Sequence, residues 1–185
     1  FLSHIREVDA IIHLVRCFES DKITHVNSKI NPVEDLETIK TEIILSDIDI
    51  IQKKLEKGKK KLLEEKQIKI LEEKLNQLNE GKEISVNDID EKKFLSSLGL
   101  LSIKPKIIVC NVDEGSLANG NTFTEEVQKK YSYEKVVTIC ADIEDQIMGL
   151  DNNEREIFMK EIGLDKTGLN QLIKEGYELL NLDTF

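Results

Sequence analysis

The chain has 185 residues and a net charge of −10, with 39% hydrophobic and 34% charged residues. This length suits one ordinary domain, alone or with an insertion, and the apolar content excludes an intrinsically disordered chain. The acidic balance argues against a protein that coats nucleic acid, and no apolar run is long enough to cross a membrane.

The three cysteines stand far apart, without the spacing of a disulfide framework or a metal motif. Such an odd, scattered set fits a reducing compartment, so we expect a cytoplasmic protein. The chain opens at Phe1 instead of a methionine, in what looks like the end of a helix. We therefore expect it to be part of a longer protein.

Three short runs rich in Ile and Val predict buried strands at residues 10–17, 106–110 and 135–140. Their apolar residues do not alternate with polar ones, which is typical of a parallel sheet covered by helices on both faces. Residues 122–131, with Thr122 as the helix cap, predict a helix between the second and third strands, and hence a right-handed βαβ unit. Further helices are predicted at residues 142–150, 153–162 and 169–180.

About ninety residues separate the first two strands, and most of them are periodic. Pro32 lies in the first turn of a predicted helix, after which apolar residues recur at steps of three and four. The steps are interrupted at Gly58 and continue to Gly81, which predicts two antiparallel helices packed as a short coiled-coil hairpin. A shorter helix at residues 90–98 leads back to the second strand. We therefore predict a helical insertion at residues 31–101 of an α/β domain.

Open α/β sheets bind ligands beyond the carboxyl ends of their strands. The second strand leads into residues 111–114 (Asn-Val-Asp-Glu) and the third into residues 140–142 (Cys-Ala-Asp). The Asn111 amide can tie neighbouring loops together, the Glu114 carboxylate can accept hydrogen bonds from a purine edge, and Ala141 offers a backbone N–H and room for a base. From these residues alone, an ordinary turn is the commoner explanation.

Several longer stretches carry a family resemblance: residues 1–7 (Phe-Leu-Ser-His-Ile-Arg-Glu), 15–19 (Val-Arg-Cys-Phe-Glu), 111–114 and 176–180 (Gly-Tyr-Glu-Leu-Leu). Through them, essentially the whole chain resembles the YchF family, the Obg-like ATPases of the P-loop GTPase superfamily. The resemblance implies a partial P-loop NTPase G domain, residues 1–30 and 102–185, with residues 31–101 as an inserted helical hairpin. It also implies that a P-loop segment before Phe1 and a TGS-type domain after Phe185 lie outside this sequence.

The resemblance implies that residues 111–114 occupy the base-recognition position that reads Asn-Lys-x-Asp in ordinary GTPases. Val112 replaces the lysine and Glu114 replaces the aspartate that selects guanine, so that selection should be relaxed in favour of ATP. Residues 140–142 lie where the superfamily has Ser-Ala-Lys, of which only the alanine is retained. The predicted base-binding residues are Asn111, Val112, Glu114, Cys140 and Ala141.

His25 matches the histidine that the family is thought to use in place of the water-positioning glutamine of the superfamily. A neutral imidazole could orient or activate an attacking water. Without the resemblance, a lone loop histidine is more often an ordinary surface residue. His4 and His13 have no such support, and the three histidines lack metal-ligand spacing, so we predict no metal site in this chain.

The sequence contains no Gly-x-x-x-x-Gly-Lys-Ser/Thr loop, the element that cradles the phosphates and supplies a hydroxyl ligand for Mg²⁺. We therefore expect Mg²⁺ with ATP or GTP in the full-length protein and no cofactor on this piece. The piece alone is predicted to be inactive.

The predicted turn of the hairpin is strongly basic, with six lysines and one glutamate in residues 53–61, whereas residues 113–185 hold sixteen acids and seven bases. A basic turn on an otherwise acidic protein can bind phosphate groups. The family's association with ribosomes favours a contact with the ribosome or rRNA. A solvated turn is the alternative, and sequence-specific RNA reading is not expected because no aromatic residue lies among the lysines. The predicted contact residues are Lys53, Lys54, Lys57, Lys59, Lys60 and Lys61.

Cys17, Cys110 and Cys140 each fall at the end of a predicted strand. A redox switch or an adventitious metal site is conceivable there, but a buried cysteine acting as a small hydrophobe is far commoner.

The leading hypothesis is a ribosome-associated ATPase or GTPase that binds a purine nucleotide and hydrolyses its γ-phosphate. The alternative is a non-enzymatic helical-hairpin module that binds the ribosome, RNA or a protein partner. Dimerisation through the stripe of Leu71, Leu75 and Leu78 is a third possibility, although we expect a monomer without a membrane partner.

Overall fold

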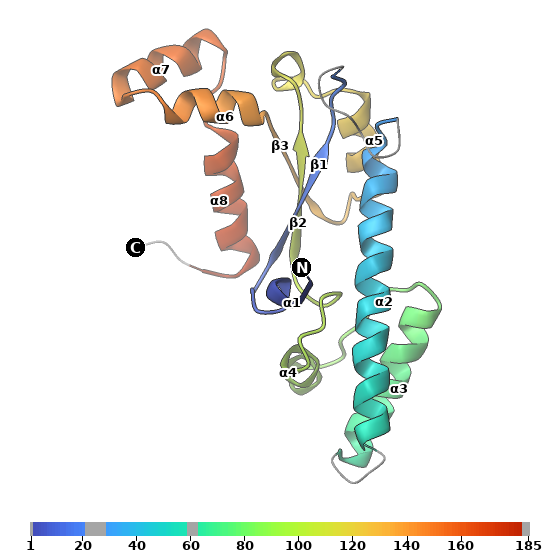
Figure 1. Ribbon diagram of the computed structural model, residues 1–185. Coiled ribbons are helices and arrows are strands. Elements are labelled where there is room, and N and C mark those ends of the chain that lie inside the picture. The colour runs from blue at the N-terminus through green and yellow to red at the C-terminus, as the bar shows by residue number, and fades with distance from the viewer. Residues whose placement is uncertain (1, 21–28, 59–62, 183–185) are drawn as a thin grey trace. The chain divides into compact units, whose positions relative to one another are not determined.

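The computed structural model describes residues 2–20, 29–58 and 63–182 (Figure 1). Strands β1 (Ile11–Arg16), β2 (Lys106–Asn111) and β3 (Lys135–Ile139) form a parallel sheet in the order β1-β2-β3. The register places Arg16 beside Asn111, and Asn111 beside Ile139, so the carboxyl ends of all three strands lie along one edge. The predicted α/β class and parallel sheet are therefore confirmed.

The helices follow the predicted positions to within one or two residues at most ends. They are α1 (Leu2–Ile5), α2 (Pro32–Gly58), α3 (Glu65–Asn79), α4 (Ile89–Ser97), the 3₁₀ turn η1 (Glu114–Ser116), α5 (Thr122–Lys130), α6 (Ala141–Met148), α7 (Asn152–Glu161) and α8 (Gly168–Leu179). Over the described ranges, none of these helices combines the length and apolar character needed to cross a membrane.

The predicted cap of α5 was wrong by one residue. Asn121, not Thr122, caps this helix: its Oδ1 accepts from the Thr124 N–H at 3.1 Å, and the Thr124 hydroxyl accepts from the Asn121 N–H at 2.8 Å. An asparagine is at least as good a cap as a threonine, and the shift lets Thr124 complete a reciprocal capping box.

The chain divides into two compact units. A helical unit holds the residues up to Asp9 together with Glu37–Lys104, and an α/β unit holds Ala10–Leu36 and the residues from Pro105 onward. The first turns of α2, which we expected in the inserted hairpin, lie in the α/β unit because Val33 and Leu36 pack into its core. Conversely, the segment around α1 packs within the helical unit.

Helices pack on both faces of the sheet in the α/β unit. On one face, Ile107, Val109 and Val137 pack against Leu172 and Leu179 of α8. The opposite face forms the larger core with α5, α6 and the start of α2, to which the strands and their ends contribute Val15, Cys17, Ile108, Cys110, Val112 and Cys140. The cover is incomplete over β1, where Ile12 and Leu14 are 55% and 62% exposed.

The helical unit has its own core, in which α2 and α3 run antiparallel beside α4 (Figure 1). Ile51 and Leu55 of α2 pack with Leu71 and Leu78 of α3, and all four side chains are buried. Two of the three leucines proposed for dimerisation are thus used inside the chain's own core, which argues against that stripe as a dimer contact.

A single carboxylate joins three segments of the helical unit. Asp47, in the middle of α2, is fully buried and accepts from Arg6 Nη1 at 3.1 Å, from the Leu101 N–H at 3.1 Å, and from the N–H and hydroxyl of Ser102 at 2.8 and 2.5 Å. Arg6 also donates to the Gly99 carbonyl at 2.5 Å. A buried carboxylate is tolerated when its oxygens are saturated in this way.

A second buried charge joins α3 to α4. The Lys74 side chain is fully buried, with Nζ 2.6 Å from Glu91 Oε1 and 2.8 Å from Glu73 Oε1. Burial alone would lower the pKa of Lys74, but its bonds to Glu73 and Glu91 outweigh burial and raise that pKa. Burial would likewise raise the pKa of Glu91, but bonds from Lys74 and Asn87 leave that pKa lowered.

Changing Lys74 to Met should reduce the free energy of unfolding by about 3–5 kcal/mol, because it leaves Glu91 charged and buried without its partner. Chemical denaturation of the chain measures this loss. The matched control is Lys69→Met, which removes the exposed Lys69–Glu65 pair and should cost less than about 0.5 kcal/mol. Equal effects of the two changes would contradict the prediction.

The contribution of this pair should also depend on pH. A carboxyl whose folded pKa is lowered stabilises the fold above its usual pKa of 4.5, and this stabilisation is lost as the pH falls through the lower folded value. An amine whose folded pKa is raised loses its contribution only as the pH rises above 10.5. Without Lys74, burial should raise the pKa of Glu91, so the difference in stability between the wild type and Lys74→Met should shrink as the pH falls from that raised value to the lowered value in the wild type.

Candidate functional site

Asn111, the last residue of β2, joins the loops that follow β2 and β3. Its Oδ1 accepts a hydrogen bond from the Ala141 N–H at 3.0 Å. One residue on, the Val112 N–H donates to the Ile139 carbonyl at 2.8 Å, which continues the strand pairing past the end of β2. The two loops that carry the predicted base-binding residues are therefore held together at one edge of the sheet.

In the loop after Asn111, the side chain of Val112 is buried and that of Glu114 is exposed. The Val112 side chain is 2% exposed and lies in the core. The Asp113 carboxylate accepts from the Ser116 N–H at 2.9 Å and so caps η1. Glu114, the first residue of that turn, is exposed. Of the two neighbouring acids, Asp113 is thus engaged in holding the loop, and Glu114 is presented to solvent.

Cys140 begins α6 as its cap residue, and its side chain is buried. Burial raises the pKa of this thiol, the carboxylates of Asp142 and Glu114 raise it further, and the N–H groups of Ile143 and Asp142 oppose the rise.

Ala141 is exposed, as a residue next to a bound base would need to be. Its N–H already donates to Asn111, however, so a ligand would have to share or replace that bond. The side chains of Val112 and Cys140 point into the core, which leaves only their main chain for contact with a base. Asn111, Glu114 and Ala141 are therefore the predicted residues that this edge presents together.

The three cysteines lie together in the core beneath this edge, and all are free thiols. A hydrogen bond with Cys110, together with burial, raises the pKa of Cys17 far above its ordinary value. The same bond lowers the pKa of Cys110 despite its burial. Thiols buried in this way act as small apolar groups, as expected for most buried cysteines.

Asn121 lies at the same edge and has no counterpart among the predicted site residues. Its Nδ2 donates to the Cys17 carbonyl at 2.7 Å and to the Ser116 hydroxyl at 3.2 Å. Gly120, at a φ of +70°, makes the turn before it, and a Cβ there would clash with the Thr124 hydroxyl. The Gly-Asn-x-x-Thr order, with asparagine as the better cap, is the sequence signal that could have identified this residue.

Other predicted residues lie elsewhere. His25 and Lys59, Lys60 and Lys61 fall outside the described residues; Lys53 and Lys57 are exposed near the end of α2, and Lys54 is half-buried. His13 is half-buried on β1, where burial and the charge of Lys106 lower its pKa. Within residues 2–20, 29–58 and 63–182, no group of three His, Cys, Asp or Glu side chains could hold a metal ion.

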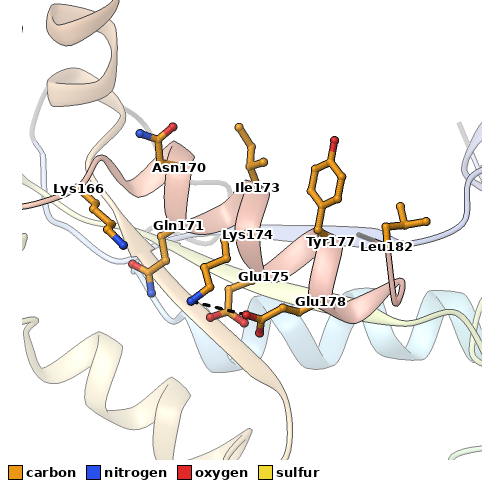
Figure 2. A pocket seen from close by; sticks show the side chains of 9 residues that line it. All are labelled: Lys166, Asn170, Gln171, Ile173, Lys174, Glu175, Tyr177, Glu178 and Leu182. Atoms are coloured by element: carbon orange, nitrogen blue, oxygen red, sulfur yellow. Dashed lines mark ion pairs between the residues drawn. The ribbon is translucent and has the colours of Figure 1, made fainter. Parts of the chain in front are cut away.

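A groove lies along the outer side of α8 (Figure 2). Ile173 and Tyr177 line it beside polar side chains that include Lys174 and Glu178. Lys174 Nζ lies 3.6 Å from Glu178 Oε1. None of the predicted site residues lines this groove, so it is separate from the edge that carries Asn111 and Glu114.

Comparison with known proteins supports the resemblance noted in the sequence. The chain is 39% identical over 194 residues to the ribosome-binding ATPase YchF of Escherichia coli O157:H7, covering 100% of this chain and 53% of that protein. It is also 39% identical over 196 residues to the Bacillus subtilis protein of the same name, covering 54% of it. No family model matches the chain.

A solved structure agrees with the sequence relatives. The Schizosaccharomyces pombe YchF GTPase aligns with a TM-score of 0.86 at 26% identity, over 97% of this chain and 52% of that one. The chain thus spans about half the length of the proteins it matches. Both the family resemblance and the expected P-loop GTPase type of fold are confirmed over the part that the chain spans.

Changing Asn111 to Ala should lower the free energy of unfolding by about 0.5–1.5 kcal/mol, because the Ala141 N–H loses its acceptor at a partly exposed position. Urea denaturation of the chain measures the effect. Asn119→Ala, at an exposed position of the same loop region, is the matched control and should change stability by less than about 0.5 kcal/mol. A loss at Asn111 no larger than the control would mean that the tie between the loops contributes nothing to the fold.

Proposed function

Since the chain matches the YchF family over its whole length in sequence and nearly so in fold, we propose that it is the purine-reading part of a ribosome-associated ATPase or GTPase. The observation that carries the proposal is the joined edge of β2 and β3. There Asn111 binds Ala141, and the exposed Glu114 lies on the turn beside them.

The edge offers a purine base two kinds of hydrogen-bonding partner. Asn111 keeps its amide N–H₂ as a donor, since the tie to Ala141 uses only its oxygen. The Glu114 carboxylate can accept from ring or exocyclic N–H groups of a base. Glutamate is one methylene longer than the aspartate of ordinary GTPases, and Val112 supplies no cation, so a strict preference for guanine is not expected.

The phosphates and the metal must be held by residues other than those described. The sequence has no phosphate-binding loop, and the described residues provide no cluster that would hold Mg²⁺. The described residues thus do not fit the metal that the family resemblance implies, and their own contribution is to the base. We accordingly expect the 185-residue chain by itself to bind nucleotide weakly and to hydrolyse none.

We assign His25 the role of orienting or activating the attacking water in the whole protein. His25 lies in the segment that follows β1 in the sequence, and β1 ends at the carboxyl edge from which the base-reading loops leave the sheet. A neutral imidazole has the acid–base range that this role requires.

The lysines at the end of α2 support a contact with the ribosome. Lys53 and Lys57 are exposed there, and three further lysines follow in sequence, whereas the region after β2 is acidic. Opposite charge on separate parts of the chain favours binding of phosphate by the lysines alone. A ribosomal partner in turn implies a cytoplasmic protein. The lysines would also suit a purely non-enzymatic hairpin module, but every observation that favours such a module equally favours the hydrolase proposal.

Changing Glu114 to Asp in the whole protein should increase the affinity for GTP relative to ATP by about tenfold or more, because the shorter carboxylate restores the pair of bonds to guanine. Calorimetric titration with each nucleotide measures the ratio. Glu125→Asp, the same change at an exposed position of α5, should leave the ratio unchanged. If Glu114→Asp does not move the ratio, Glu114 does not read the base.

Changing Lys53, Lys54 and Lys59–Lys61 to Glu should weaken co-sedimentation of the whole protein with ribosomes and flatten its dependence on salt. Each lost phosphate contact should reduce the slope of log affinity against log salt by about one. The control is Lys92 and Lys93 changed to Glu, since both are exposed on α4. Co-sedimentation that is unaffected by the first set, or affected equally by both, would exclude a specific role for these lysines.

A further inference from the structure

The two ends of the Asn121 side chain perform different tasks. Its oxygen accepts from the Thr124 N–H and caps α5, a task that aspartate or serine could also perform. Its amide nitrogen has no part in that cap and donates instead to the Cys17 carbonyl at 2.7 Å and to the Ser116 hydroxyl at 3.2 Å. The residue type at this position is therefore set by more than the helix.

The two acceptors of the amide belong to segments that matter for the proposed site. Ser116 is the last residue of η1, the turn that begins at Glu114. Cys17 directly follows β1, and its own N–H donates to the Asn111 carbonyl at 2.7 Å. The Asn121 amide thus bridges the Glu114 turn to a segment that is itself bonded to Asn111.

The Asn121 bridge adds a link to a neighbouring segment to the bonds that the turn makes within itself. Asp113 caps the turn from within, and the Gly120 N–H donates to the Ser116 carbonyl at 2.8 Å, but both bonds lie inside residues 113–120. The side-chain bonds of Asn121, by contrast, connect this turn to the segment after β1. Without them, the turn would keep the bonds within residues 113–120 but lose its side-chain link to the segment after β1.

We propose that Asn121 is a positioning residue for base recognition: through its amide donors it fixes the Glu114 turn against the end of β1. This role is separate from its capping of α5. The inference rests on the proposed reading of a purine base by Asn111 and Glu114.

The substitution Asn121→Asp separates the two roles, because it keeps a side-chain oxygen for the cap and removes both N–H donors. In the whole protein, we expect Kd for ATP to rise by about tenfold, the scale of one lost hydrogen bond in a fixed geometry. The Kd of tripolyphosphate, which has no base, should change by less than about twofold, and the melting temperature should stay within a few degrees of the wild type. Asn121→Ser, which also keeps a capping oxygen, should weaken ATP binding in the same selective way.

Asn119→Asp is the matched control, since it makes the same change and adds the same charge at an exposed position two residues away. It should leave both affinities unchanged. Equal weakening of ATP and tripolyphosphate by Asn121→Asp, or a loss of ATP affinity matched by Asn119→Asp, would overturn the inference by assigning the effect to general damage or to charge.

The Glu114→Asp variant distinguishes this inference from the function on which it rests. If Glu114→Asp changes the ATP to GTP ratio while Asn121→Asp and Asn121→Ser bind ATP like the wild type, the positioning role is wrong and base reading stands. If neither Glu114→Asp nor the Asn121 variants alter base-dependent affinity, the proposed function itself fails, and the inference fails with it.

Discussion

The buried carboxylate of Asp47 is the interaction on which the arrangement of the helical unit depends. It lies near the middle of α2 and receives hydrogen bonds from Arg6 and from Leu101 and Ser102, residues separated from it by 41 to 55 positions. A carboxylate without these donors would be costly to bury, so the fold of this unit requires all three segments to be in place at once. Arg6 precedes β1 in the sequence and Ser102 precedes β2, so one charge joins two segments that are far apart along the chain.

The α/β unit joins its loops with two asparagine side chains and one main-chain bond. At the carboxyl edge of its sheet, hydrogen bonds run sideways from Asn121 to Cys17, from Cys17 to Asn111, and from Ala141 back to the Asn111 side chain. Each bond joins a loop to its neighbour. The pairing of the strands therefore also fixes the positions of the loops relative to one another. A site built on this edge has its geometry fixed before any ligand arrives, which is the condition for selective hydrogen bonding to a base.

Much of the fold could be predicted from local pattern. Runs of Ile and Val predicted the strands, and steps of three and four predicted the helices, because burial on a sheet and on a helix leaves different periods in the sequence. The hydrogen bonds and ion pairs of the buried charged side chains could not be predicted in this way. Asp47 and Lys74 look like ordinary charged positions of amphipathic helices, and their partners are distant in the chain or on another helix. For the site, the sequence indicated which loops meet, but it did not indicate that Val112 and Cys140 turn inward or that Asn121 joins the edge.

The distribution of the cysteines has a practical consequence for following how the molecule opens. All three thiols are buried in the α/β unit, and the helical unit contains none. A thiol reagent can reach them only when the core beneath the loops is transiently exposed, so the rate of labelling reports the opening equilibrium of that unit alone. The wild-type chain therefore carries its own probe of local unfolding, positioned under the edge that the loops share.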